Sequence, residues 1–450
     1  MTPPKRQLGV LIAAALVIAN MIGAGVFTSA GFQAAYQFKD PVSMMSTWVV
    51  GGVLALAGAG CYAELGSLMP HAGGEYIYLR DAYHPVVGFM SGWVSLVVGF
   101  SAPIAAAALL FASYLGAIMP GLASSGMMKL VACIVIAGMT ALHAIDTRVG
   151  GRVQTVLTTI KVLLIAGFVI AGVAIGTGDW GHFASRGDGL VKLGTRAGAS
   201  AYANALMYVS FAYSGWNAAA YIAGEIDRPQ RTLPRSLLLG TGVVMLLYIA
   251  LNLVFLYAVT PEQMAVDPIK QPVGAIAARA LFGQHAGDLL SALIALALMS
   301  AVSAMMMAGP RVYATMAADH ALPKPLAYYS KRGVPVVAVI VQCVLAIGFA
   351  IFSDPDGLVR LVGFTLAIFA ALTVGAVFVF RARGQVSPFR VPGYPLTPLL
   401  FLGLSAWTVF FGVSSQPKLT AEIVAVLVAG GLMYFFTSRG KPRTPIEADE

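Results

Sequence analysis

Lys161 is an ionisable residue inside a long apolar stretch, TVLTTIKVLLIAGF, about nine residues beyond Arg152. On a helix rising 1.5 Å per residue, that spacing puts it about 13 Å from Arg152. A lysine at mid-membrane costs about 2.5 to 3.5 kcal/mol, so such a residue indicates function. Its ammonium would replace a coupling sodium ion by bonding unwound backbone carbonyls of the first predicted helix and hydroxyls such as those of Ser300 and Ser303. Alternatively, it would release its proton during each transport cycle. Both alternatives stay open.

The first apolar stretch contains the segment NMIGAGVF, from Asn20 to Phe27. Gly23 and Gly25 lie about two-thirds of the way along it, where each glycine costs about 1 kcal/mol relative to alanine in a helix. Two glycines at this spacing predict an interrupted helix, which exposes backbone groups for a substrate. Close helix packing is the alternative, but its usual signature spaces the glycines four apart, as in GxxxG.

A second segment, FAYSGWNAAAY from Phe211 to Tyr221, introduces polar residues into another apolar run. Ser214, Gly215 and Asn217 predict a second interruption. The alternative is a continuous helix whose Ser and Asn side chains bond a neighbouring helix.

The acidic residues cluster near predicted cytoplasmic helix ends, such as Glu64, Glu75, Glu225 and Asp227. We expect Glu64 to form a structural ion pair rather than to bind substrate. The central parts of the predicted first, third, sixth, eighth and tenth helices carry no Asp or Glu, which disfavours polyamines, arginine and lysine as cargo.

The elements that would position these residues are membrane helices. The 450 residues are 58% hydrophobic and 10% charged, where soluble proteins have about a quarter charged residues. Because a bilayer core needs roughly 20 apolar residues per helix, we predict an all-α membrane protein forming one domain, 1–450. Its twelve predicted spans lie near 8–36, 44–69, 86–118, 128–145, 153–177, 199–224, 236–259, 286–316, 335–352, 358–381, 396–413 and 420–437.

The two predicted interruptions fall in the first and sixth of these helices. Helices 1–5 (about 8–177) and 6–10 (about 199–381) would then form an inverted five-plus-five repeat, each half opening with a broken helix. Helices 11 and 12 (about 396–437) would stand outside it.

Lysine and arginine predict the orientation of the chain. With the N-terminus inside, eighteen of the 28 basic residues fall in cytoplasmic segments and nine on the opposite side, Lys161 being the remaining one. The positive-inside tendency therefore predicts cytoplasmic termini. The first apolar run is too long for a signal peptide and lacks its cleavage site, so we expect it to be retained. A multi-pass protein of the cell (inner) membrane follows.

Several classes of function are disfavoured. The net charge of +9 comes without a basic stripe interleaved with aromatic residues, so we expect no nucleic-acid partner. Six histidines show no metal-ligand spacing and no nucleophile pairs with a base, which disfavours a metal site, an enzyme and a cofactor. Three cysteines, all within apolar runs, predict no disulfide framework.

Five motifs resemble the amino acid-polyamine-organocation superfamily, and within it the L-type amino acid transporter branch. The resemblance covers nearly the whole chain and rests on these segments: IGAGVF from Ile22, YAELGSLMPHAGGEYIYLRDAY from Tyr62, FAYSGWNAAAYIAGEIDRPQRTLPRSL from Phe211, GPRVYATMAADHALP from Gly309 and PFRVPGYPLTP from Pro388. It implies a LeuT-like fold and transport of amino acids.

The resemblance also implies a substrate site. The substrate carboxylate would meet backbone amides at Gly23, Ala24 and Gly25, next to Ile22. Its amine would bond carbonyls of Met21, Phe211 and Ser214, with Gly215 in the same unwound stretch. Phe211 would gate the site and Trp216 would line it or support the sixth helix.

In sodium-independent members of the superfamily a lysine stands at the place of Lys161, and proton-coupled relatives share a similar one. Ser214 stands where many relatives have glycine, which should narrow the amine end of the pocket. Some eukaryotic relatives join a glycoprotein through a disulfide, but no cysteine lies in the predicted extracellular loops. We therefore expect no such partner.

The leading hypothesis is a sodium-independent carrier of neutral amino acids that works by alternating access. A proton-coupled symporter is the alternative. A transporter-like sensor that binds amino acids without moving them is a third hypothesis.

Overall fold

The computed structural model describes residues 9–70, 73–145, 147–184, 189–221, 223–319 and 322–438. Within these ranges the chain forms helices and no strand, as the sequence predicts. The α-helices are α1 (Val10–Met21), α2 (Gly25–Tyr36), α3 (Pro41–Leu68), α4 (Glu75–Ala82), α5 (Pro85–Val94), α6 (Ser101–Ile118), α7 (Ser125–Ile145), α8 (Thr147–Ile175), α9 (Arg196–Tyr213), α10 (Ala218–Tyr221), α11 (Pro229–Ala258), α12 (Pro261–Met264), α13 (Val273–Phe282), α14 (Gln284–Ala318), α15 (Val336–Phe352), α16 (Pro355–Ala382), α17 (Leu396–Ser415) and α18 (Pro417–Ser438).

Ten helical segments of the described chain are long and apolar enough to cross a membrane. They coincide with ten of the predicted spans, which makes the chain a multi-pass membrane protein. The predicted span 199–224 falls on α9 and α10, which an interruption separates. The predicted span 335–352 falls on α15, an apolar helix of 17 residues. An arrangement of twelve spans thus remains a proposal.

Both predicted interruptions are present. Helix α1 ends at Met21 and α2 begins at Gly25. Helix α9 ends at Tyr213 and α10 begins at Ala218. We call residues 22–24 the first break and residues 214–217 the second break.

Other features of the helices could not be read from the apolar runs. The span Pro85–Ile118 contains a π-helical stretch, η1 (Ser95–Phe100), between α5 and α6. Short helices α4, α12 and α13 lie between the long ones, and 3₁₀ turns occupy η2 (Pro120–Leu122), η3 (Trp180–Ala184), η4 (Ala223–Glu225) and η5 (Lys324–Ala327).

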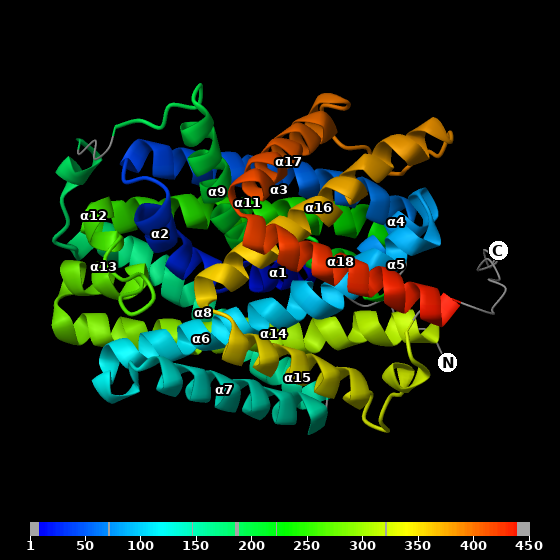
Figure 1. Ribbon diagram of the computed structural model, residues 1–450, viewed down its shortest axis with the longest axis horizontal. Helices are drawn as coiled ribbons and strands as arrows, with labels where there is room; N and C mark the ends of the chain where they lie inside the picture. Colours follow the sequence, from blue (N-terminus) through cyan, green and yellow to red (C-terminus); the bar gives the residue numbers. More distant parts are fainter. Residues whose placement is uncertain are drawn as a thin grey trace.

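Helix α1 lies in the middle of the bundle, where it packs against α10, α11 and α14 (Figure 1). Helices α6, α7 and α14 run side by side along the long axis of the molecule. Helix α2 packs against α9 and α13. The first break is thus enclosed by protein, which is where membrane proteins tolerate non-helical backbone.

Candidate functional site

The first break depends on a glycine at the start of α2. A Cβ on Gly25 would lie 2.5 Å from the Cα of Ala212 on α9, so no larger residue fits without moving backbone. A Cβ on Gly23 would have its nearest neighbours at 3.8 Å and 3.9 Å, an ordinary contact distance. Gly25 therefore packs the two helices closely, whereas Gly23 leaves space inside the break.

The second break also depends on a glycine. Gly215 has a φ of +94°, which L side chains rarely adopt, and a Cβ there would lie 2.8 Å from the carbonyl oxygen of Asn20. Gly215 thus approaches α1 as Gly25 approaches α9. The two breaks face each other, and the predicted site residues from both helices come together.

Only part of this region is exposed. Gly23, Ser214, Gly215 and Asn217 are partly exposed. The other predicted substrate residues are buried: Met21, Ile22, Ala24, Gly25, Phe211 and Trp216. The partly exposed residues of the two breaks are thus two glycines, a serine and an asparagine.

Two of the three predicted amine acceptors already accept hydrogen bonds. The carbonyl of Phe211 accepts from the Ser214 backbone N–H at 3.1 Å and from the Ser214 hydroxyl at 2.7 Å. The carbonyl of Met21 accepts from the Tyr248 hydroxyl at 2.7 Å. A substrate amine would have to displace or share these bonds.

Tyr248 joins the two breaks and was not predicted from the sequence. It lies fully buried on α11, with its hydroxyl 2.7 Å from the Met21 carbonyl and 3.1 Å from the Ala212 carbonyl. A hydroxyl has a single proton, so it donates to one carbonyl at a time. Tyr248 can therefore exchange its bond between the end of α1 and the end of α9.

Lys161 reaches the first break. Its side chain, 0% exposed on α8, donates to the Ala19 carbonyl at 2.8 Å and to the Ile22 carbonyl. Ile22 follows the last helical residue of α1 and is not helical itself. The expected contact between Lys161 and the unwound carbonyls of the first helix is thus present.

The two predicted serine partners of Lys161 lie on α14 and bond other residues. The Ser300 hydroxyl lies 3.4 Å from that of Thr158, one turn before Lys161 on α8. The Ser303 hydroxyl lies 2.9 Å from Nε2 of His143 on α7. Ser300 and Ser303 thus join α14 to α8 and α7.

The expected structural role of Glu64 is confirmed. Its carboxylate receives two hydrogen bonds from Arg381 on α16, both at 2.7 Å, and one from the Val391 backbone at 2.7 Å. Such a bidentate pair is strong and geometrically specific. Glu64 therefore joins α3 to α16 and to the segment before α17.

Glu75 reaches the second break through Asn217, whose side-chain amide donates to the Glu75 carboxyl at 2.7 Å. From the sequence, Glu75 was expected only near a helix end. Burial raises the pKa of this carboxyl, and hydrogen bonds from Tyr62, Asn217 and Ser91 oppose that rise.

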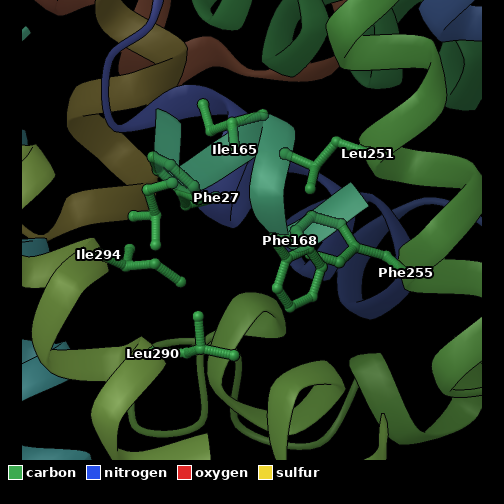
Figure 2. A pocket seen from close by; sticks show the side chains of 8 residues that line it. Phe27, Ile165, Phe168, Leu251, Phe255, Leu290 and Ile294 are labelled. Carbon is green, nitrogen blue, oxygen red and sulfur yellow. The ribbon is translucent and has the colours of Figure 1, made fainter. Parts of the chain in front are cut away.

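A pocket next to the first break is lined only by apolar side chains. Figure 2 shows Phe27, Ile165, Phe168, Leu251, Phe255, Leu290 and Ile294 around it, from α2, α8, α11 and α14. Ile165 is one turn beyond Lys161 on α8. Its apolar lining offers no partner to the charged ends of an amino acid, so the pocket is distinct from the predicted substrate contacts.

Metal binding was not expected from the sequence. In the part of the chain that the structure describes, no group of three or more His, Cys, Asp or Glu side chains is arranged to hold a metal ion.

Known proteins resemble the chain along almost its whole length. The family described as amino acid permease matches residues 8–436. The serine/threonine exchanger SteT of Bacillus subtilis (strain 168) is 31% identical over 444 residues, covering 97% of this chain and 98% of that protein. The large neutral amino acids transporter small subunit 2 of Rattus norvegicus is 28% identical over 446 residues, covering 96% and 80%. The b(0,+)-type amino acid transporter 1 of Homo sapiens is 27% identical over 460 residues, covering 97% and 88%.

Proposed function

The chain belongs to the amino acid permease family of the amino acid-polyamine-organocation superfamily, and we propose that it carries neutral amino acids by alternating access, without sodium. It is a transporter and not an enzyme. The twelve-span, LeuT-like arrangement with inverted halves is part of the proposal. Two breaks that face each other support this arrangement, although the helices that contain them are far apart in the chain. Such breaks form substrate sites in transporters of this type.

The observation that carries the sodium-independent part is the bonding of Lys161. Its ammonium donates to the carbonyls of Ala19 and Ile22, at the C-terminal end of α1. A helix C-terminus carries partial negative charge and favours a cation. We propose that the lysine supplies there the charge that a sodium ion would otherwise supply.

The proposed substrate contacts are those of the two breaks. The carboxylate would bond amides of Gly23, Ala24 and Gly25 at the start of α2, a helix that no side chain caps in the described residues. An uncapped helix N-terminus favours an anion. The amine would bond carbonyls of Met21, Phe211 and Ser214, replacing the hydrogen bonds that two of them now accept.

The hydrogen bonds of Glu75, the carboxyl group that contacts the second break, favour a neutral cargo. Glu75 already accepts hydrogen bonds from Tyr62, Asn217 and Ser91. A cationic side chain would have to break that arrangement to pair with it. We propose small neutral amino acids, because the Ser214 side chain occupies the amine end of the site.

Uptake into proteoliposomes tests the proposed function. We expect saturable uptake of labelled L-serine in sodium-free buffer, and competition by other small neutral amino acids in a panel of twenty. Liposomes preloaded with serine would take it up faster than empty ones if the chain is an exchanger. Strict dependence on sodium would contradict the proposal, and thermal stabilisation by serine without any flux would instead indicate a sensor.

Proton coupling is a second candidate, favoured by one observation. The hydrogen-bond acceptors described for Lys161 are neutral carbonyls rather than a carboxylate. An ammonium without a compensating negative charge is costly in the membrane. We expect a proton symporter to show uptake that an inward proton gradient accelerates and that acidifies the liposome lumen; an exchanger would show neither.

We further propose that both termini are cytoplasmic and that the chain lies in the inner membrane. The distribution of lysine and arginine supports this orientation.

We also propose that no disulfide joins a partner subunit. The three cysteines lie within α3, α7 and α15, where the structure shows them unpaired. Migration on non-reducing gels of membranes would reveal a linked partner as a heavier band.

A further inference from the structure

Glu75 lies at the centre of a cluster of polar side chains from α3, α4, α5, the second break and α10. The Tyr62 hydroxyl on α3 donates to the Glu75 carboxyl at 2.5 Å, and the Asn217 amide donates at 2.7 Å. Ser91 on α5 donates at 3.5 Å. The Asn217 amide also reaches the Tyr221 hydroxyl on α10, at 3.2 Å. We call Tyr62, Glu75, Ser91, Asn217 and Tyr221 the Glu75 cluster.

The backbone before Glu75 is shaped to fit against α10. Gly73 and Gly74 have positive φ angles of +126° and +50°. A Cβ on Gly74 would lie 2.6 Å from Cδ1 of Tyr221, so the chain passes directly against that ring. Positive φ and close approach together require glycine here. The turn therefore presents the Glu75 carboxyl to the second break.

The same cluster reaches a second residue of the break. Tyr62 packs edge-on against Trp216, with ring centroids 4.5 Å apart. Trp216 and Asn217 directly follow Gly215 in the chain. The two side chains after this glycine are thus held by Tyr62 and Glu75.

Helix α10 has little stability of its own. It is four residues long, one turn, and a single turn fixes several dihedral angles for very few hydrogen bonds. Its position must therefore come from side-chain contacts with its neighbours. Asn217, the residue before its first turn, makes the polar contact to Glu75.

We propose that Glu75 is a positioning residue that holds Asn217, and through it the second break, in the arrangement that binds substrate. The proposal deepens the proposed transport function and rests on it. Glu75 acts through Asn217 and does not contact the substrate itself. Its loss would let the stretch from Ser214 to Asn217 move, which lowers substrate affinity more than the maximal rate.

A donor and acceptor exchange tests this directly. In Glu75→Gln an amide group meets the donors of Tyr62 and Asn217. In Asn217→Asp two carboxyl groups face each other. In the double variant the amide introduced at position 75 would donate to the carboxylate introduced at position 217. Tyr62 and Asn217 bond the same Glu75 oxygen, so the second N–H of the new amide would face the Tyr62 hydroxyl and its carbonyl would face Ser91. The new carboxylate would also accept from Tyr221.

For labelled L-serine uptake we expect each single variant to raise KM roughly tenfold, the size of one lost charged hydrogen bond. The double variant should return to within about threefold of the parent. Glu262→Gln, an exposed acidic residue outside the cluster, is the matched control and should leave KM unchanged. Single variants that leave KM unchanged, or a double variant no better than the product of the two singles, would overturn the proposal.

Thermal unfolding of the detergent-solubilised variants provides a reading that does not need transport. We expect both single variants to unfold at lower temperature than the parent, and the double variant to regain most of the loss. If the parent takes up no amino acid, the transport function fails, yet recovery of stability in the double variant would still support the bond. Additive losses in the double variant would overturn the positioning role regardless of transport.

Discussion

The two breaks are held in different ways, one by a basic side chain and the other by an acidic one. At the first break the ammonium of Lys161 bonds backbone carbonyls at the end of α1. At the second break the carboxyl of Glu75 bonds a side chain, the Asn217 amide. Substituting Ala19 or Ile22 leaves their backbone carbonyls in place. A variant can therefore remove the contact at the first break only by replacing Lys161. A contact between side chains can be removed or exchanged from either end.

Removal of Lys161 should have the largest effect. Lys161→Ala leaves the Ala19 and Ile22 carbonyls buried without this donor, which costs about 1 to 3 kcal/mol for each. Because about 1.4 kcal/mol corresponds to a factor of ten in an equilibrium, we expect serine uptake to fall at least tenfold. The measurement is initial uptake by purified protein reconstituted at matched density.

Lys418→Met serves as the control for that variant, since Lys418 is exposed and lies at the start of α18. Its uptake should match the parent. Comparable loss in both variants, or full activity of Lys161→Ala, would show that the lysine at the first break has no special role.

The glycine of the second break should be next in size. Gly215→Ala places a Cβ 2.8 Å from the Asn20 carbonyl oxygen at a φ of +94°. Overpacking of this kind costs about 1 to 3 kcal/mol, so we expect a lower unfolding temperature and weaker uptake. Gly242→Ala, in α11 with no atom within 4 Å of the added Cβ, is the matched control and should be neutral or slightly stabilising. Equal behaviour of the two variants would rule out the close approach.

Tyr248 couples the two breaks, and its removal should have a smaller effect. Tyr248→Phe keeps the ring and removes the hydroxyl that donates to Met21 or Ala212. The loss of one buried hydrogen bond is worth about 1 kcal/mol. We expect a roughly fivefold fall in the rate of serine uptake. Tyr83→Phe, whose hydroxyl bonds Leu372 far from the breaks, should retain the parental rate; an equal fall there would point to a general effect of lost tyrosine hydroxyls.

The smallest effect concerns selectivity. Ser214→Gly removes the hydroxyl that bonds the Phe211 carbonyl and widens the amine end of the proposed site. We expect the ratio of L-leucine to L-serine uptake to rise a few-fold. This is less than the roughly tenfold or more that one methylene contributes in a closed pocket, because Ser214 is partly exposed. Competition of both amino acids against labelled serine measures the ratio. An unchanged ratio would place the substrate side chain away from Ser214.

Local sequence patterns indicated where the breaks form but did not determine them. The glycines at 23 and 25 and the polar run at 214–217 disfavour helix, yet the same Gly-Ala-Gly triplet at 58–60 lies inside the continuous helix α3. The buried position of Lys161 was predictable from the sequence around it, because the middle of a long apolar run lies far from both ends of its helix.

The partners of these residues were not predictable, because they are distant in the chain. Tyr248 and Met21 are 227 positions apart, and Asn217 and Glu75 are 142 apart. A tyrosine in an apolar helix and a glutamate near a helix end are common and carry no local signal. The contacts of Ser300 and Ser303 also depend on distant residues: both lie on α14, and their hydroxyls bond Thr158 and His143. Their part in the site of Lys161 stays a prediction.

A sodium titration of uptake tests the central claim most directly. Labelled L-serine uptake by the parent protein in proteoliposomes would be measured as choline is replaced stepwise by sodium at constant ionic strength. Since Lys161 already supplies the positive charge at the end of α1, we predict saturable uptake without sodium and no change along the series. Uptake that appears only as sodium is added would contradict the proposal.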